Sequence, residues 1–378
     1  MVRGPTETLV KVDPFAILNP GELYWRDHSE WLEQVCGYRL RPRFRPDWVP
    51  SWHADPRKAP FRIICEDAWS PFAQTTVDAV RIRDKADVFL KTVNLVRHPH
   101  EVEIGRFLTS LGPQRENHCV PILEILEPPD SSGTVILVMP LLRSYDSPKF
   151  DTFGEVVEMF RQLFEGMQFM HKHDVAHRDA HCLNIMMDGA RLFPHGFHPD
   201  HQHLKPDKYS DASHTTRTWI PVKYYFVDFG ISRRYASAQR EGELWEPIIR
   251  SGDKSPPEHD GMVSADPFPT DVYLLGNFIK TQFIEGDGVI SFGFHGFKFI
   301  TALVQEMTQT EPTHRPTMDE VVVRFADIQK KSSCWKLRSR VVGKKESRWM
   351  KPPRLVMHWS RRFRSIAVRR PPLPVPSD

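Results

Sequence analysis

The chain has 378 residues, of which 40% are hydrophobic and 26% are charged, so it can bury a full core and is too apolar to be disordered. Its five cysteines include no close pair, which argues against a disulfide framework or a zinc ribbon and favours a reducing compartment. No apolar run is long enough to span a bilayer, and the first residues lack the apolar stretch of a signal peptide. We therefore expect a soluble intracellular protein, cytoplasmic or nuclear, without a transmembrane segment.

The formal net charge of +3 is unevenly distributed along the chain. Residues 331–378 contain 14 lysines and arginines against two carboxylates, a net of +12, so residues 1–330 carry −9. A basic segment beside an acidic body predicts an anionic partner: nucleic acid, acidic lipid or the body itself. We expect residues 331–378 to form a disordered tail.

Residues 1–58 are rich in arginine and contain Trp25, Trp31, Trp48 and Trp52. A helix is predicted from about residue 22 to residue 36, because Pro20-Gly21 precedes it and Gly37 follows it. Interleaved arginines and aromatic residues can bind single-stranded nucleic acid. The interpretation that we favour is an arm that packs its tryptophans on the rest of the domain.

From residue 59 the pattern changes to short apolar runs, which predict antiparallel strands at 61–65, 75–82, 87–93, 117–123 and 134–139. Lys91 falls inside one of these strands, where an amine on a buried face needs an anionic partner. The predicted helix from Glu101 to Leu111 provides one, because Glu101 lies three residues before Ile104 on its apolar side. We favour Glu101 over Glu103 as this partner.

Pro140 to Leu142 ends the predicted sheet, because proline cannot donate to a sheet, and a long amphipathic helix follows. That helix leads to the loop His177-Arg178-Asp179, with Asn184 five residues after the aspartate. A second aspartate, Asp228, ends a later apolar strand. Phosphoryl transfer needs this combination: one aspartate orients a hydroxyl and takes its proton, while the asparagine and the second aspartate hold magnesium.

Residues 189–222 form an insertion between this loop and the Asp228 strand. The insertion contains His195, His198, His201 and His203, whose spacing could ligate a metal, although solvated loop histidines are the commoner case. Farther on, Thr317-Met-Asp-Glu320 is a capping box that predicts a last helix ending near Lys330.

The ordered set of motifs resembles the eukaryotic protein kinase superfamily over residues 60–330, and most closely its fungal-type, kinase-like subgroup. The motifs are Lys91, Glu101, His177-Arg178-Asp179 with Asn184, Asp228-Phe229-Gly230, Pro256-Pro257-Glu258, Asp271 with Gly276, and Arg315-Pro316. The resemblance implies a bilobal α+β fold within residues 59–330. Its small β-rich N-lobe would span 59–140 and its larger helical C-lobe 141–330.

The resemblance also implies a role for each motif residue. Lys91, held by Glu101, would contact the ATP phosphates; Asn184 and Asp228 would hold Mg²⁺; Asp179 would be the catalytic base. Met139 would be the gatekeeper, followed by a hinge from Pro140 to Leu142 whose backbone meets adenine. Other roles would be structural or regulatory: Glu258 pairs with Arg315, Asp271 braces the loop, and Arg178 responds to phosphorylation at Ser237, Ser251 or Ser255.

Two departures from the family pattern leave three functions open. No glycine lies between Cys65 and Lys91, so the phosphate-covering glycine loop is missing, and His181 replaces the lysine two residues after the base in serine/threonine kinases. We expect an ATP- and Mg²⁺-dependent protein kinase acting on Ser/Thr more than on Tyr. The alternatives are a pseudokinase scaffold and a small-molecule phosphotransferase, whose Asp-x-His-x-x-Asn resembles the stretch from Asp179 to Asn184.

Overall fold

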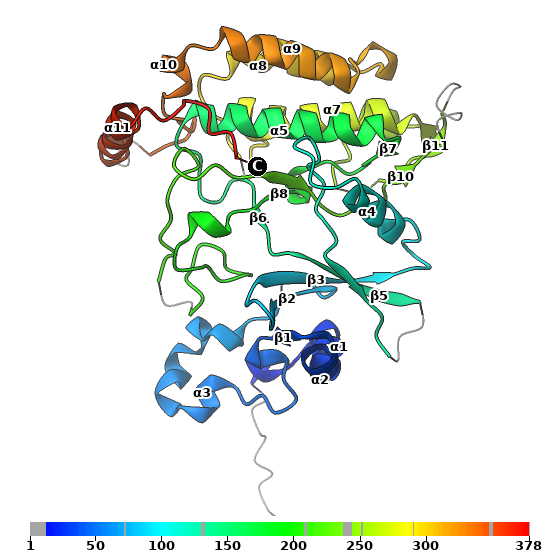
Figure 1. Ribbon diagram of the computed structural model, residues 1–378, viewed down its shortest axis with the longest axis vertical. Coiled ribbons are helices and arrows are strands. Elements are labelled where there is room, and N and C mark those ends of the chain that lie inside the picture. The colour runs from blue at the N-terminus through cyan, green and yellow to red at the C-terminus, as the bar shows by residue number, and fades with distance from the viewer. Residues whose placement is uncertain are drawn as a thin grey trace, which may run out of the picture.

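The computed structural model describes residues 13–71, 73–129, 133–207, 210–236, 244–250, 252–289, 291–347 and 351–377. The protein is a mixed α+β structure. A twisted sheet lies between the N-terminal elements and a larger helical part, and the C-terminal helix α11 lies at the outer edge of that helical part (Figure 1).

The main sheet has five antiparallel strands in the order β1-β2-β3-β5-β4. Their bounds are β1 Tyr38–Leu40, β2 Thr76–Arg81, β3 Asp87–Asn94, β4 Glu124–Leu126 and β5 Thr134–Pro140. Successive side chains of a strand point to opposite faces. Val88 and Leu90 therefore pack with the N-terminal elements, whereas Val93 joins the core shared with the helical part. Lys91 lies on the same face as Val93, which we call the inner face.

The N-terminal arm packs on the sheet and also contributes β1 to it. The predicted helix at 22–36 is α1 (Pro20–Asp27), α2 (Ser29–Trp31) and a π-helical turn (Leu32–Cys36) that ends at Gly37, where φ is +78°. The strand predicted at 61–65 is wrong, because 3-10 turns span Pro56–Ile64 and follow the short helix α3 (Ser51–Ala54). Pro56 and Pro60 lack the N–H that a strand would donate.

The helical part is built around α5 (Phe153–Lys172), whose predicted apolar stripe from Val156 to Met170 is buried. The other helices are α4 (Glu101–Ser110), α7 (Pro267–Ile279), α8 (Lys298–Met307) and α9 (Met318–Lys331), the last with the predicted capping box. Short strands connect these helices. They are β6 Arg143–Ser144, β7 Val175–Ala176, β8 Ile185–Met187, β9 Tyr224–Phe226, β10 Arg233–Arg234, β11 Glu246–Pro247 and β12 Ser264–Ala265.

The prediction of a disordered tail is wrong for the part of residues 331–378 that the structure describes. This part contains α10 (Cys334–Leu337) and α11 (Lys351–Ala367). Asp151, just before α5, holds α11 by pairing with His358 at 3.2 Å and Arg361 at 3.6 Å. In the ranges given above, no helix combines the length and the apolar character needed to cross a membrane.

The arm is organised around Arg43, whose guanidinium is buried. Its Nε donates to Glu22 at 2.6 Å, and its two terminal nitrogens donate to the carbonyls of Phe15, Ile17 and Asp67. Because water cannot replace these partners, each is needed to offset the cost of burying the charge.

We predict that Arg43→Met lowers the free energy of unfolding by about 3–5 kcal/mol, because it leaves the Glu22 carboxylate buried without its partner. The measurement is urea unfolding followed by tryptophan fluorescence. Arg39→Met is the matched control: Arg39 pairs with Glu33 at 2.7 Å in a solvent-exposed position, so its loss costs less than about 1 kcal/mol. Equal effects of the two substitutions would contradict this account of the arm.

Candidate functional site

Lys91 of β3 connects the sheet, helix α4 and the helical part. Its Nζ lies 2.6 Å from Glu101 Oε1 and 2.8 Å from Asp228 Oδ1. Burial opposes the charge, but the attraction of Asp228 and Glu101 outweighs it and raises the pKa of the Lys91 amine. The predicted choice of Glu101 is confirmed, because Glu103 is exposed on the opposite side of α4 near His100.

Asp228 follows β9 in a left-handed conformation, with φ at +64°. A non-glycine residue rarely adopts this conformation, and such residues cluster at functional sites. Burial raises the pKa of the Asp228 carboxyl group. Lys91 and the hydrogen bond from the Gly230 amide lower that pKa by more, so it ends below its usual value. Asp228 is therefore ionised at neutral pH, with its carboxylate half-exposed at 48%.

The loop that carries Asp179 is held by Asp271 at the start of α7. The carboxylate of Asp271 accepts hydrogen bonds from the amides of His177 and Arg178, both at 2.7 Å, which supports Arg178 at a φ of +69°. Asn184 donates its amide to the backbone carbonyl and to the carboxylate of Asp179, both at 2.9 Å. The predicted bracing by Asp271 is therefore confirmed, and Asn184 fixes the rotamer of Asp179.

His181 lies beside the proposed base, with its Nε2 3.5 Å from Asp179 Oδ1. Burial opposes protonation, but the hydrogen bonds with Asp179 and Cys182 and the negative charge of Asp179 outweigh it and raise the pKa of His181 to about 9. The Leu183 amide donates a long hydrogen bond of 3.4 Å to His181 Nδ1, and this bond is lost when Nδ1 is protonated. The cation that replaces the family's lysine is thus half-buried against Asp179.

A later segment crosses over Asp179 and His181. A Cβ on Gly252 would lie 2.4 Å from Asp179 Oδ1, so the backbone at Gly252 packs directly on the carboxylate. Arg178 donates to the Pro247 carbonyl at 2.5 Å and lies 3.9 Å from Glu246. A substrate hydroxyl can reach Asp179 only after the backbone near Gly252 moves.

Arg178 thus has partners in this segment without phosphorylation. Of the three candidate acceptors, Ser255 accepts a hydrogen bond from Asn277 at 2.9 Å, and Ser237 and Ser251 lie outside the described residues. Phosphorylation at any of the three stays a prediction.

The inner face of the sheet changes character toward Pro140 and Leu142, the predicted hinge. Phe89 lies two residues before Lys91 on this face, and β-sheet pairing places it opposite Asp78 on β2 and Met139 on β5. Asp78 is buried there, and burial raises the pKa of its carboxyl group although Arg41 lowers it. A bulky ring and a buried carboxylate therefore occupy the inner face of the sheet near the predicted hinge.

Arg41 compensates the charge of Asp78 and joins four segments of the chain. It lies 2.9 Å from Asp78, 2.9 Å from Glu66 and 2.5 Å from Asp200 of the insertion. His198, also in the insertion, is buried 3.5 Å from Glu66. Burial favours the neutral form of Glu66, but His198 and Arg41 outweigh it and lower the pKa of Glu66 to about 2. We call these five residues the Arg41 cluster.

The insertion reaches the hinge as well as the Arg41 cluster. Gln202 donates to the Leu142 carbonyl at 3.4 Å and accepts from the Ser144 amide at 3.2 Å. The rings of His198 and His201 lie 5.4 Å apart. Within the described ranges, His, Cys, Asp and Glu side chains nowhere gather in a group of three or more that could hold a metal ion.

The two ends of the cleft differ in how well they fit Mg·ATP. At the phosphate end, the Lys91 amine, the ionised Asp228 and the Asn184 amide fit phosphates and magnesium, which prefers one or two carboxylates and amide oxygens. At the other end, Phe89 and Asp78 occupy the inner face of the sheet, and Asp78 is paired with Arg41 at 2.9 Å, so a bulky ring and a charged pair that fit a purine base poorly lie there.

Glu258 and Arg315 form the predicted supporting pair below the site. Their side chains are buried, and the guanidinium donates to both carboxylate oxygens at 2.7 and 2.8 Å. Sequence reasoning found this pair because both residues belong to motifs. It missed Arg41, Asp78 and Asp200. Two signals were available in the sequence: Phe89, a bulky residue two positions before Lys91, and Asp78, the one aspartate in the apolar run 75–82.

No protein-family model matches the chain, and no curated protein matches it.

We predict that the pKa of His181 lies near 9 and falls toward its ordinary value of 6.5 in Asp179→Asn, which removes the charge that favours the imidazolium. NMR titration of the histidine rings measures it. His118 is the internal reference, because burial lowers its pKa to about 3 and it stays neutral across the titration.

The raised pKa also fixes the sign of a stability effect. The His181–Asp179 contact stabilises the folded state fully below pH 6.5, and this contribution is lost as the pH rises through about 9. The difference in unfolding free energy between the wild type and Asp179→Asn should shrink over that interval. A difference that grows with pH would contradict the assignment.

Proposed function

We propose that this chain is an ATP- and Mg²⁺-dependent phosphotransferase of the eukaryotic protein kinase type, with a bilobal fold, that acts on protein hydroxyls. One observation carries the proposal: Lys91 bridges Glu101 and Asp228 while Asn184 fixes Asp179 in the adjoining loop. A structural core has no need of an ionised amine, two carboxylates and an amide at one cleft, because burying such groups costs stability.

The chain's own residues account for most of the chemistry. Mg·ATP supplies the phosphoryl group that is transferred. Lys91, Asn184 and Asp228 would hold its phosphates and magnesium. Asp179 orients the acceptor hydroxyl and accepts its proton, with a carboxylate whose direction Asn184 sets. His181 keeps a positive charge beside the reacting groups up to about pH 9.

A protein substrate is favoured over a small alcohol by the surroundings of Asp179. The cover over Asp179 is a stretch of main chain, seen at Pro247 and Gly252, which contacts Arg178 and the base itself. A substrate peptide carries the same backbone groups as the main chain that it would displace. Displacement of this cover by a substrate peptide would therefore expose the base without exposing the core.

The Arg41 cluster favours a second candidate, a pseudokinase that acts as a scaffold. If Arg41 never leaves Asp78 and Asp200, adenine has no place beside the hinge. If Arg41 leaves transiently, the apparent dissociation constant for Mg·ATP is the intrinsic constant divided by the fraction of molecules in which Arg41 is displaced. The two candidates therefore differ in whether Mg·ATP stabilises the folded protein.

We predict that Mg·ATP raises the melting temperature and that this shift requires magnesium. A ligand at a hundredfold its dissociation constant stabilises by about 2.7 kcal/mol, and the cost of displacing Arg41 makes the shift smaller at a given concentration. Asp228→Asn should reduce the shift strongly, because it removes a magnesium ligand. Asp179→Asn should keep the shift and abolish transfer to a general protein substrate, because the base does not hold the nucleotide.

A magnesium-dependent shift without transfer in the wild type would support the pseudokinase. No shift at millimolar Mg·ATP in a folded protein would overturn nucleotide binding altogether. Transfer to aminoglycosides or choline, with none to proteins, would favour the small-molecule phosphotransferase over the protein kinase.

We also predict that Lys91→Met abolishes transfer while the protein stays folded, because methionine fills a similar volume and removes the charge. Radiolabelled phosphate transfer and near-ultraviolet circular dichroism check the two halves of this prediction. Lys330→Met is the control, since that lysine is 79% exposed at the end of α9. Unchanged turnover in Lys91→Met would refute the role of Lys91.

A further inference from the structure

Helix α11 buries polar side chains and exposes apolar ones, which is the reverse of an ordinary surface helix. A surface helix buries its apolar stripe and exposes its polar one. In α11 the residues turned toward the body are polar, namely His358, Arg362 and Ser365, and all three are buried. The large apolar residues of the helix lie on its outward side.

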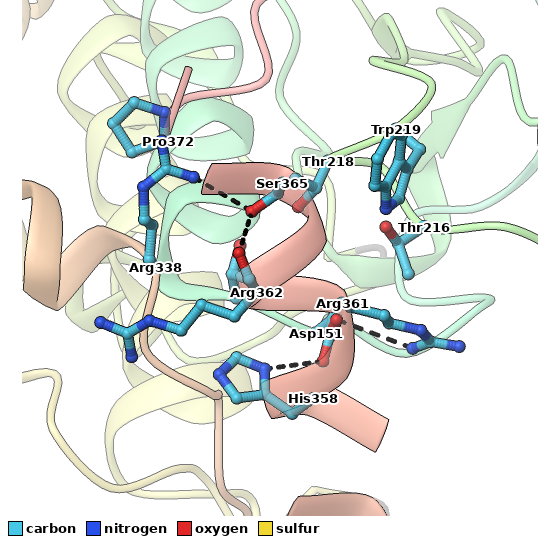
Figure 2. A pocket seen from close by; sticks show the side chains of 11 residues that line it. Asp151, Thr216, Thr218, Trp219, Arg338, His358, Arg361, Arg362, Ser365 and Pro372 are labelled. Atoms are coloured by element: carbon cyan, nitrogen blue, oxygen red, sulfur yellow. Dashed lines mark hydrogen bonds and ion pairs between the residues drawn. The ribbon is translucent and has the colours of Figure 1, made fainter. Parts of the chain in front are cut away.

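The inner side of α11 is held by polar contacts, which Figure 2 shows from close by. Asp151 lies between His358 and Arg361, and Ser365 accepts from Arg338 at 3.2 Å and donates to the Arg362 carbonyl at 2.8 Å. The space enclosed here is about 10 Å³, enough for one water molecule and too small for a larger ligand. This side therefore serves to attach the helix.

Most of the exposed apolar side chains of α11 gather on one side of the helix. Its helical positions 355, 359, 363 and 366 are spaced by 4, 4 and 3, which places them on one side of the helix. Four apolar side chains of the helix are exposed: Leu355 by 47%, Val356 by 71%, Phe363 by 64% and Ile366 by 44%. Trp359 stacks beside Phe363 at 5.4 Å and beside Trp335 of α10 at 6.2 Å. We call this surface, including the 65% exposed Trp335, the α11 face.

The segment that carries the α11 face is rich in positive charge. Arg364 and Arg369 are exposed on the same helix and the turn after it, with the guanidinium of Arg364 over the Trp219 ring at 4.8 Å, and Lys344 and Lys345 are exposed shortly before the helix in the chain. The carboxylate of Glu346 is already shared by Arg340 at 2.6 Å and Arg354 at 2.9 Å. The segment therefore combines net positive charge with an exposed apolar face.

We propose that the α11 face binds the surface of an anionic lipid bilayer. An amphipathic helix with arginines on one side and Trp, Phe and Leu on the other lies in the interface with its apolar side among the acyl chains. Anionic headgroups attract the surrounding lysines and arginines. Nucleic acid fits less well, because it pairs with cations and stacks on aromatic rings but gives Leu355, Val356 and Ile366 no apolar partner.

The test is co-sedimentation of the full chain with phosphatidylcholine vesicles, with and without about 30% phosphatidylserine, over a salt series. We expect binding to the anionic vesicles that weakens with salt and little binding to neutral ones. Val356→Ser/Phe363→Ser should weaken binding at least about tenfold, because it removes apolar area from the inserted side. Val323→Ser is the matched control: Val323 is 63% exposed on α9, away from the α11 face, and its replacement should leave binding unchanged.

A second double variant, Leu355→Ser/Ile366→Ser, tests the same face if the first melts at a lower temperature. Equal binding to neutral and anionic vesicles would overturn the proposal, and so would unchanged binding in both folded double variants. Concentration-dependent dimers that the same variants abolish, or DNA binding without vesicle binding, would assign the α11 face to another partner. The test is independent of phosphotransfer.

Discussion

The bridge that Lys91 makes between Glu101 and Asp228 is the constraint on which the site depends. It connects β3, α4 and the turn after β9, which are otherwise separate parts of the chain. Burial opposes the charge of the Lys91 amine, but the two carboxylates that face it outweigh this and raise its pKa, and the amine in turn lowers the pKa of Asp228. The same contacts fix the distance between the sheet and the Asp179 loop. The ion pairs of Lys91 with Glu101 and Asp228 therefore also set how the site residues are arranged.

A second set of charges holds the opposite end of the cleft. The Arg41 cluster joins the arm, the sheet and the insertion through contacts that span 37 and 159 residues of sequence. It places a charged pair on the sheet beside Phe89, two residues before Lys91. Two sets of charges are thus separated on the inner face of the sheet: the bridge at Lys91 and the Arg41 cluster at Asp78.

The sequence predicted the parts of the molecule that depend on local pattern or on motif order. The apolar stripe of α5, the capping box before α9 and the pairs Lys91–Glu101 and Glu258–Arg315 are of this kind. It failed where one segment takes its structure from a distant one. The arm supplies β1 because β2 offers a free edge, and α11 docks because Asp151 contacts both His358 and Arg361. Neither partner is visible in the composition of the segment itself, which is why the tail looked disordered and why the arm was expected to pack on the domain without adding a strand to its sheet.

If the chain binds Mg·ATP as we propose, the Arg41 cluster, and not Lys91 and Asp228, limits the affinity. The most direct measurement is titration calorimetry of Mg·ATP with the wild type and with Arg41→Leu/Asp78→Val, which replaces the guanidinium and its most buried partner by apolar side chains, while Glu66 keeps His198 and Asp200 is partly exposed. The account predicts binding at least about tenfold tighter in the double variant, and loss of that binding when Lys91→Met is added. A folded double variant that does not bind millimolar Mg·ATP would contradict it.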